Sequence, residues 1–317
     1  MGFSDLSALT VRMCSTRSGV LGDVRMASRG AVKELGGGTN SGVLTLGGSA
    51  EHYVRHGQKS VDGWLSVLDG LIISFVSAQQ QRNGISGSLG EIGIHHGRLF
   101  ILLALLARDD ERCFAVDIFE DQHLNLDRSG EGSEERFRRN LSRFDVPQDR
   151  VMVFRASSLA IGWPELMRDV DLPARMFSID GGHTAEITVN DLRIADEGLH
   201  PHGVVILDDY FNAEFPEVSQ GLCTHILSGG KLAPFAIGDN KVLLARPGQG
   251  QTYRRALIEN LPRRNFVKTT SMFGEEVTVF RTPHRMIERV RQSELTRSLT
   301  EHPLGKALKP VVRRILG

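Results

Sequence analysis

The amino-acid sequence predicts an α/β protein built on a doubly wound, seven-stranded, mostly parallel sheet with helices on both faces. The chain has 317 residues, of which 40% are hydrophobic and 24% charged, so it can bury a sizeable core. After residue 60, apolar runs typical of strands alternate with helical stretches of about 10 to 15 residues, which is the pattern of βαβ units. Consecutive βαβ units form a parallel sheet that is buried on both faces.

Each predicted element follows from a local pattern. Residues 62–81 carry apolar side chains at the i, i+3, i+4 and i+7 spacing of an amphipathic helix, which ends before Asn83-Gly84. Ser133 is a good N-cap residue and precedes two glutamates, so a helix is expected over 133–144. The remaining predicted helices span 98–107, 184–199 and 251–260. The predicted strands span 88–94, 113–119, 151–156, 174–180, 203–209, 241–246 and 276–281.

Two segments flank the predicted domain of residues 49–282, which begins with a helical lead-in. Residues 1–48 are rich in Gly and Ser and predict a flexible arm, or an arm that orders over a partner subunit or a substrate. Residues 283–317 carry eight Lys or Arg against three Glu and fit a basic amphipathic helix. This tail is expected to pack on the protein surface or, as the alternative, to make a weak peripheral contact with an acidic partner or membrane. An arm and a tail on one domain also favour a homodimer.

Composition excludes several classes of function. Lys and Arg together number 38, as do Asp and Glu, so the chain lacks the basic excess of a dedicated nucleic-acid binder. Its three cysteines are widely separated and form neither a disulfide framework nor a Cys-x-x-Cys metal pair. The N-terminus lacks the apolar segment of a signal peptide, and the longest apolar run, 99–107, is far shorter than the about 20 residues of a bilayer span. These observations predict a cytoplasmic protein without a transmembrane segment.

A glycine-containing motif follows the first predicted strand. The sequence Glu91-Ile92-Gly93-Ile94-His95-His96-Gly97 is an E-x-G-x-x-x-G pattern that stands directly before a helix. Gly93 and Gly97 allow the backbone to approach a ligand where a Cβ would collide. The spacing is neither G-x-G-x-x-G nor a phosphate-binding P-loop. Tight packing of strand against helix explains such a turn equally well.

The next two strands end in residues suited to a nucleoside. Asp117 ends the second strand, and an acid there can accept hydrogen bonds from both hydroxyls of a ribose. Ser157 and Ser158 follow the third strand, where a hydroxyl could meet the edge of a purine ring. Together they favour a nucleoside-bearing cofactor without a pyrophosphate.

The fourth and fifth strands end in acids. Asp180 lies in FSIDGGH, and Asp208 and Asp209 lie in ILDDYFN. Three carboxylates that converge on one edge of a sheet repel one another unless a cation lies between them, and oxygen ligands suit Mg²⁺ or another hard divalent ion. The simpler interpretation is that one acid caps a helix and another is solvated. His183 follows Asp180 by three residues and is either a catalyst or a hydrogen-bonding residue at the start of a helix.

These motifs resemble those of class I S-adenosylmethionine-dependent methyltransferases, and specifically of the metal-dependent O-methyltransferases. GEIGIHHG is similar to their first cofactor motif, AVDIF to the acidic second one, and FSIDGGH with ILDDYFN to the metal-binding strand ends. The likeness is closer to enzymes of the macrocin and rhamnosyl O-methyltransferase type and more distant to catechol O-methyltransferase. It covers residues 60–282 and implies a Rossmann-like fold. In the catechol enzyme a lysine base stands where this chain has His183.

The resemblance assigns roles to individual residues. It implies that the methionine end of S-adenosylmethionine is lined by the motif residues Glu91, Gly93, Ile94 and Gly97. It implies further that Asp117 holds the ribose, and that Ser157 or Ser158 touches the adenine. It implies a metal site formed by Asp180, Asp208 and Asp209. Either His183 or Asp180 would then take the proton of the acceptor hydroxyl.

The function expected from this resemblance is transfer of a methyl group to a hydroxyl, most simply of a sugar in a glycan or a glycosylated metabolite. Acceptor contacts are expected from the loop 121–132 and from Tyr210, Phe211 and Asn212. In the loop, His123, Asn125 and Asp127 could hydrogen-bond to sugar hydroxyls, and ordinary solvation of these side chains is the alternative. A metal-dependent hydrolase or phosphoryl-transfer enzyme is the rival, disfavoured because no Arg or Lys lies within the motifs around Asp180 and Asp208 to clamp a phosphate. A non-catalytic cofactor-binding scaffold is the other alternative.

Overall fold

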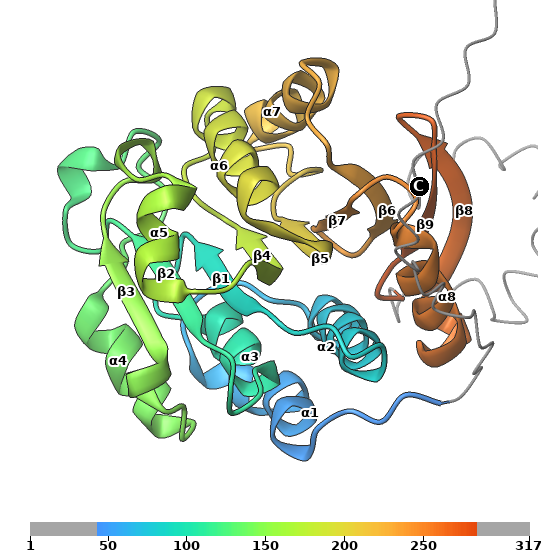
Figure 1. Ribbon diagram of the computed structural model, residues 1–317, viewed down its shortest axis with the longest axis horizontal. Helices are drawn as coiled ribbons and strands as arrows, with labels where there is room; N and C mark the ends of the chain where they lie inside the picture. Colours follow the sequence, from blue (N-terminus) through green and yellow to red (C-terminus); the bar gives the residue numbers. More distant parts are fainter. Residues whose placement is uncertain (1–42, 284–317) are drawn as a thin grey trace, which may run out of the picture. The chain divides into compact units, whose positions relative to one another are not determined.

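A computed structural model describes residues 43–283, and within them the chain forms one mixed sheet with helices on both sides (Figure 1). The strand order is β3-β2-β1-β4-β5-β7-β6-β9-β8. Strands β1 to β5 run parallel, β7 is antiparallel to both of its neighbours, and β8 is antiparallel to β9. The strands are β1 (Ser88–Ile92), β2 (Cys113–Asp117), β3 (Val151–Arg155), β4 (Ala174–Ile179), β5 (Leu199–Leu207), β6 (Ala233–Ile237), β7 (Val242–Ala245), β8 (Phe266–Met272) and β9 (Glu275–Phe280).

The helices form two layers, one on each face of the sheet (Figure 1). One layer holds α1 (Gly48–Arg55), α2 (Val67–Arg82), α3 (Arg98–Leu106), α4 (Glu134–Arg143) and α8 (Gly250–Asn260). The other holds α5 (Trp163–Val170), α6 (Ala185–Gly198) and α7 (Pro216–Leu227). Among residues 43–283, no helix combines the length and the hydropathy needed to cross a membrane.

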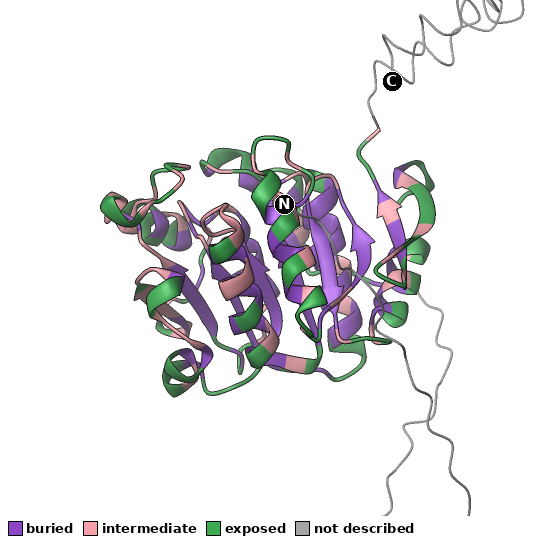
Figure 2. Ribbon diagram, turned by 90° about the horizontal axis from the view of Figure 1, so that it is seen from above, coloured by how far each residue is buried: buried purple, intermediate pink, exposed green. Residues whose placement is uncertain are grey.

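Two hydrophobic cores lie on opposite faces of the strands because successive side chains point to opposite sides. In β2, Cys113 and Ala115 join the core under α2 and α3, whereas Phe114 and Val116 join the core under α5 and α6. All residues of β1, β4 and β7 are buried (Figure 2). This two-sided burial confirms the predicted doubly wound α/β class.

The strand count is where the prediction is wrong. All seven predicted strands are present, but the described sheet has nine because β6 and β8 were missed. Strand β6 contains Pro234, and its five-residue run is too short to distinguish from a loop. Strand β8 forms the edge of the sheet and is largely exposed, so its sequence carries no apolar run.

The helix predicted over 62–81 begins five residues later than expected, at Val67. Its N-cap is Ser66, whose Oγ accepts a hydrogen bond of 2.9 Å from the backbone N–H of Asp69. Trp64 therefore stands outside the helix, in the connection that precedes it, and is 73% exposed. The short helices α1, α5 and α7 were not predicted.

Of the flanking segments, the predicted arm 1–48 lies outside the described residues except for 43–48, and the predicted tail 283–317 does so beyond Pro283. The amphipathic helix expected in that tail also falls outside the described part of the chain.

Candidate functional site

The candidate site is a cavity of about 460 Å³ at the carboxyl ends of the parallel strands. Strands β2 and β3 lie on one side of β1, and β4 and β5 lie on its other side. The strand order therefore reverses between β1 and β4. Ligands of open α/β sheets bind at such a reversal. The cavity is lined by ten of the predicted site residues: Glu91, Gly93, Ile94, Asp117, Ser157, Ser158, Asp180, His183, Asp208 and Asp209.

The two motif glycines have different roles. Gly93 has φ +85°, and a Cβ there would stand 1.8 Å from the backbone carbonyl oxygen of Asp180, so only glycine fits against the end of β4. Gly97 has φ +87° and caps α3, but it does not line the cavity. A Cβ at Gly97 would lie 2.6 Å from a ring carbon of Phe137, so glycine makes room for that ring. The packing interpretation therefore accounts for Gly97, whereas Gly93 brings bare backbone to the cavity wall.

Asp117 connects the end of β2 to the glycine loop, which is the segment 93–97 between β1 and α3. Its carboxylate accepts hydrogen bonds from the backbone N–H groups of Ile94 and of His95, the latter at 2.8 Å, and from Phe119 at 2.5 Å. Burial raises the pKa of Asp117 even though these three N–H groups act to lower it. The carboxylate lines the cavity, so it both shapes the loop and faces the space beside it.

Ser157 and Ser158 form the wall at the end of β3. Ser157 caps a short 3₁₀ helix, Ser158–Ala160, by accepting a hydrogen bond of 3.3 Å from the N–H of Leu159. The backbone carbonyl of Ser158 accepts a hydrogen bond of 2.8 Å from the side chain of Asn190 on α6. Both serines are thereby fixed at the cavity wall.

Glu91 lies within β1 and is 2% exposed. Burial, reinforced by the charge of Asp180, raises the pKa of Glu91 well above its ordinary range. The hydroxyl of Ser178 on the neighbouring strand β4 donates a hydrogen bond of 3.0 Å to Glu91 Oε1. Burial therefore favours the neutral form of Glu91 in the floor of the cavity.

Asp208 is paired with a lysine that the sequence interpretation overlooked. The ammonium of Lys241, which immediately precedes β7, contacts Asp208 Oδ2, and both side chains are almost fully buried. Asn240 Nδ2 donates to the other carboxylate oxygen at 3.1 Å. Burial acts against the charge of Lys241, but the carboxylates of Asp208 and Asp180 raise its pKa above the usual range. The motifs around Asp180 and Asp208 contain no Arg or Lys, as the sequence shows, but the fold brings Lys241 to these acids because β7 is antiparallel and its start meets the end of β5.

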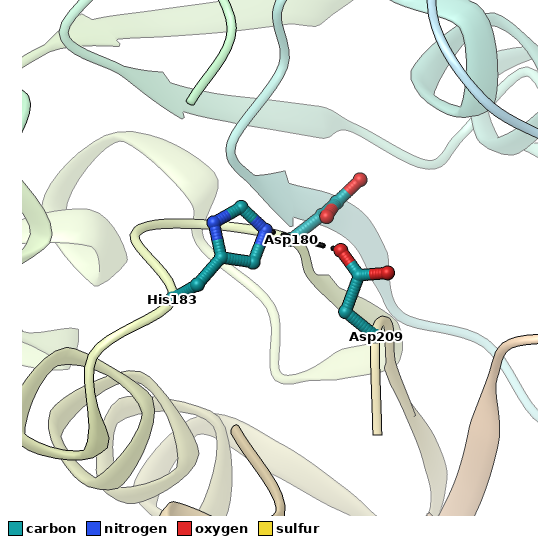
Figure 3. Close-up of side chains that lie close together, drawn as sticks. All are labelled: Asp180, His183 and Asp209. Atoms are coloured by element: carbon teal, nitrogen blue, oxygen red, sulfur yellow. Dashed lines mark hydrogen bonds and ion pairs between the residues drawn. The ribbon is translucent and has the colours of Figure 1, made fainter. Parts of the chain in front are cut away.

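His183 is held between two carboxylates. Asp127 Oδ2 lies 2.7 Å from Nδ1. On the other side of the ring, Asp209 Oδ2 lies 3.1 Å from Nε2, a contact that Figure 3 shows. The ring also stacks on Phe215 with 3.8 Å between centroids. Burial acts to lower the pKa of His183, but its hydrogen bonds to Asp209 and Asp127 raise it to about 9.

Asp209 follows β5 in a left-handed conformation, with φ +55°, which turns its side chain toward His183. Its other oxygen accepts hydrogen bonds from Asn212 at 3.0 Å and from Asn240. Burial raises its pKa, but the hydrogen bonds from His183, Asn212 and Asn240 outweigh this and lower the pKa of Asp209 to about 2.

The acid cluster consists of Asp180, Asp208 and Asp209. Within it, only the carboxylate of Asp180 accepts no hydrogen bond from residues 43–283. Burial and then the charge of Asp208 raise its pKa well above the ordinary range. One donor atom each from Asp180, His183 and Asp209 lies within 4.8 Å of the others, so these three side chains could hold a metal ion. This set contains His183 in place of the predicted Asp208.

The loop 121–132, which was expected to contact the acceptor, lines the cavity through Asn125 but not through His123 or Asp127. Asp127 binds His183, and Asn125 binds within its own loop, to Gln122 and to the backbone carbonyls of 129 and 130. His123 is exposed and does not line the cavity. Of the three candidates after β5, Asn212 lines the cavity, whereas Tyr210 and Phe211 do not.

Three exposed apolar side chains line the cavity and were not predicted as site residues: Trp64, Leu124 and Leu126. Trp64 lies before α2, and its ring centroid is 5.6 Å from that of His95. The sequence signal for Trp64 was its position just before Ser66, a residue suited to an N-cap. The spacing of the apolar residues over 62–81 instead placed Trp64 within the predicted helix.

Residues 91–210 match a family model described as a methyltransferase domain. The matched segment begins at Glu91 in β1 and ends at Tyr210 after β5, so it contains the glycine loop, Asp117 and the acid cluster. The match confirms the predicted resemblance to methyltransferases over this segment.

Several solved structures are similar to this chain. The O-methyltransferase NovP is 19% identical, with 56% of this chain and 79% of NovP covered and a TM-score of 0.46. TomG of Streptomyces achromogenes, an O-methyltransferase solved with S-adenosylmethionine, is 19% identical, with 65% and 92% covered and a TM-score of 0.45. CalS11, a TDP-rhamnose 3'-O-methyltransferase, is 16% identical, with 56% and 79% covered and a TM-score of 0.42. No curated protein sequence matches the chain. We draw no substrate from likeness at these levels.

Proposed function

We propose that the protein is an S-adenosylmethionine-dependent, divalent-cation-dependent O-methyltransferase that acts on a sugar hydroxyl. The observation that carries the proposal is the coincidence of two independent features. The segment that matches a methyltransferase domain, residues 91–210, also supplies most of the lining of the cavity at the strand-order reversal.

The cavity fits S-adenosylmethionine in volume and in chemistry. Gly93 presents bare backbone, Asp117 has remaining acceptor capacity beside its three backbone partners, and the two serines stand at the far wall. We propose that Gly93, with Glu91 and Ile94 behind it, faces the methionine end. Asp117 then accepts the ribose hydroxyls, and Ser157 or Ser158 meets the adenine. Gly97 keeps only a packing role.

The acid cluster fits a divalent cation. The carboxylate of Asp180 faces the cavity and receives no hydrogen bond from the part of the chain that the structure describes. An unpaired carboxylate in such a place is costly unless a cation or a proton joins it. The sequence motifs predict Mg²⁺ on Asp180, Asp208 and Asp209. A bound divalent cation lowers the pKa of an oxygen that it contacts, which is the activation a sugar hydroxyl needs.

The proton of the acceptor hydroxyl is assigned to Asp180. Both ring nitrogens of His183 already face carboxylates, Nδ1 that of Asp127 and Nε2 that of Asp209, so neither nitrogen is free to take the proton of the acceptor hydroxyl. The carboxylate of Asp180 lines the cavity and accepts no hydrogen bond from residues 43–283, so one of its oxygens can take the proton while the other faces the cation. The protein's further task is to align the hydroxyl oxygen, the methyl carbon and the sulfur.

A sugar acceptor is supported by the sequence motifs and by the mixed chemistry of the cavity lining. Trp64 offers a flat apolar face, while Asn212 and Asn240, whose side-chain nitrogens donate to Asp209, offer their carbonyl oxygens as acceptors. Such a pairing suits a ring that has one apolar face and hydroxyls at its rim. We propose an acceptor in a glycan or a glycosylated metabolite.

The phosphoryl-transfer alternative is disfavoured on a new ground. Lys241 does lie at the acid cluster, but it is buried against Asp208 and does not line the cavity, so it cannot clamp a phosphate there. The remaining expectations stay proposals: a catalytic domain of residues 49–282, a homodimer, peripheral contact through 283–317, a cytoplasmic location and no nucleic-acid partner.

Isothermal titration calorimetry with S-adenosylmethionine, with and without a divalent cation, tests the proposal. We expect binding of both ligands to the same chain. Absence of binding by either one would contradict the methyltransferase assignment, and binding of both without transfer to any glycoside would favour a scaffold.

A further inference from the structure

We propose that His183 supplies a nitrogen ligand to the divalent cation of this site and that Asp127 positions it, so that the site prefers Mn²⁺ or Co²⁺ to Mg²⁺. This inference rests on the proposed function, because it names the class of ion that the methyltransferase would use. It replaces Asp208 by His183 in the ligand set.

The imidazole of His183 is fixed by contacts on its Nδ1 side. Asp127 Oδ2 lies 2.7 Å from Nδ1 and also accepts a hydrogen bond of 2.6 Å from the backbone N–H of His183. Ser129 Oγ lies 3.0 Å from the same ring nitrogen. Phe215 stacks on the ring at an interplanar angle of 15°. A carboxylate on one nitrogen is the usual outer partner of a metal-bound histidine, and here it leaves Nε2 to face the acids.

The Nε2 atom shares its space with two carboxylates. Asp209 Oδ2 lies 3.1 Å from Nε2, and donor atoms of Asp180, His183 and Asp209 all lie within 4.8 Å of one another. Figure 3 shows the three side chains directed into one space from the ends of β4 and β5. Small side-chain rotations would therefore bring three donors to one ion.

Asp208 is less available than its neighbour. Its carboxylate is bound by the ammonium of Lys241 and by Asn240 Nδ2. If Asp208 turned to a metal ion, Lys241 would keep a buried charge without its closest partner, which is costly. The third protein ligand is accordingly the nitrogen of His183.

This exchange of ligands has a chemical consequence. Mg²⁺ prefers an all-oxygen environment, whereas imidazole nitrogen suits first-row transition ions, whose affinity rises from Mn²⁺ to Co²⁺. A set of two carboxylates and one imidazole should thus discriminate between ions that three carboxylates would bind more evenly.

The test is calorimetric titration of the full chain with MnCl₂, CoCl₂ and MgCl₂, without S-adenosylmethionine or acceptor. We expect Co²⁺ and Mn²⁺ to bind at least about tenfold more tightly than Mg²⁺. His183→Ala should remove this preference. Asp127→Asn should weaken Mn²⁺ binding by roughly 10- to 100-fold, the usual effect of losing an outer partner.

Two control variants are available. Asp121→Asn alters a carboxylate of the same loop that pairs with Arg155 rather than with His183, and His202→Ala removes a histidine that binds Gln249. Neither should change the selectivity. Should His183→Ala fail to fold, pulsed electron paramagnetic resonance of Mn²⁺ bound to the unaltered chain must show coupling to an imidazole ¹⁴N.

Equal affinity for Mg²⁺ and Mn²⁺, or Mn²⁺ binding without nitrogen coupling, would overturn the inference. The outcome is separable from that of the proposed function. A chain that binds Mn²⁺ through nitrogen but transfers no methyl group refutes the function alone, and one that methylates with Mg²⁺ bound as tightly as Mn²⁺ refutes this inference alone.

Discussion

The carboxylate of Asp117 lies 2.8 Å from the backbone nitrogen of His95 and accepts its hydrogen bond, although the two residues are 22 positions apart. The same oxygen accepts from the N–H of Ile94. The acid at the end of β2 therefore determines the conformation of the glycine loop after β1, and the two cofactor motifs act as one unit.

Replacing Asp117 by alanine should weaken binding of S-adenosylmethionine by roughly 1 to 2 kcal/mol, because hydrogen bonds to a charged acceptor are lost and the loop is released. Calorimetry measures this directly. Asp121→Ala, a change to an acid that pairs with Arg155, is the control and should leave the dissociation constant unaltered. An unchanged constant for the Asp117 variant would remove this residue from the site.

Lys241 and Asp208 should behave as a coupled buried pair. Lys241→Met leaves the carboxylate of Asp208 buried without its cation and should lower the free energy of unfolding by about 3 to 5 kcal/mol. The double variant Lys241→Met with Asp208→Asn should recover a large part of that loss. Denaturant unfolding of the four proteins gives the coupling energy, and simple additivity of the two single changes would argue against the pairing.

Trp64 should contribute to acceptor binding. Its side chain lines the cavity, is exposed and does not pack in the core. Trp64→Ala should therefore raise the KM for the acceptor by roughly 3- to 10-fold, the value of one aromatic contact, with little change in kcat. Val267→Ala, at an exposed apolar position on the edge strand β8, is the matched control. A fall in kcat at constant KM would place Trp64 elsewhere in the mechanism.

Asp191 on α6 should make the protein less stable as pH rises. Burial raises the pKa of Asp191 to about 7, and its Oδ2 has no hydrogen-bond partner in the described structure. Between about pH 4 and pH 7 the unfolded chain has lost this proton while the folded chain retains it, so folding stability falls across that window. Asp191→Asn should match the unaltered protein near pH 4 and exceed it at pH 8 by up to roughly 4 kcal/mol.

Thermal or urea unfolding at both pH values measures this difference. Asp149→Asn, at an exposed position, should show no such divergence. A variant of Asp191 that is less stable at pH 8 than the unaltered protein would mean that the hydrogen bonds from Asn190 and Ser158 outweigh the cost of burying the charge of Asp191.

Sequence reasoning reached the fold and the strand-end residues because both depend on local patterns. Apolar strands alternate with capped helices, and polar residues mark where strands stop, as at Asp117 and Asp180. It missed Lys241 because the direction of β7, and so the place where its first residue falls, depends on strand pairing. It assigned Asp127 to acceptor contacts for a related reason. Asp127 and His183 are 56 positions apart in the sequence, and only the folded sheet brings them together.

The central claim is methyl transfer to a sugar hydroxyl with Asp180 as the proton acceptor. The most direct measurement supplies S-adenosylmethionine with an isotopically labelled methyl group to a panel of glycosides, with a divalent cation, and reads the products by mass spectrometry. We predict a singly methylated glycoside with the unaltered chain and at least about a 100-fold lower rate with Asp180→Asn, while affinity for S-adenosylmethionine stays within a few-fold. No labelled glycoside from the unaltered chain, or full activity of the variant, would contradict the account.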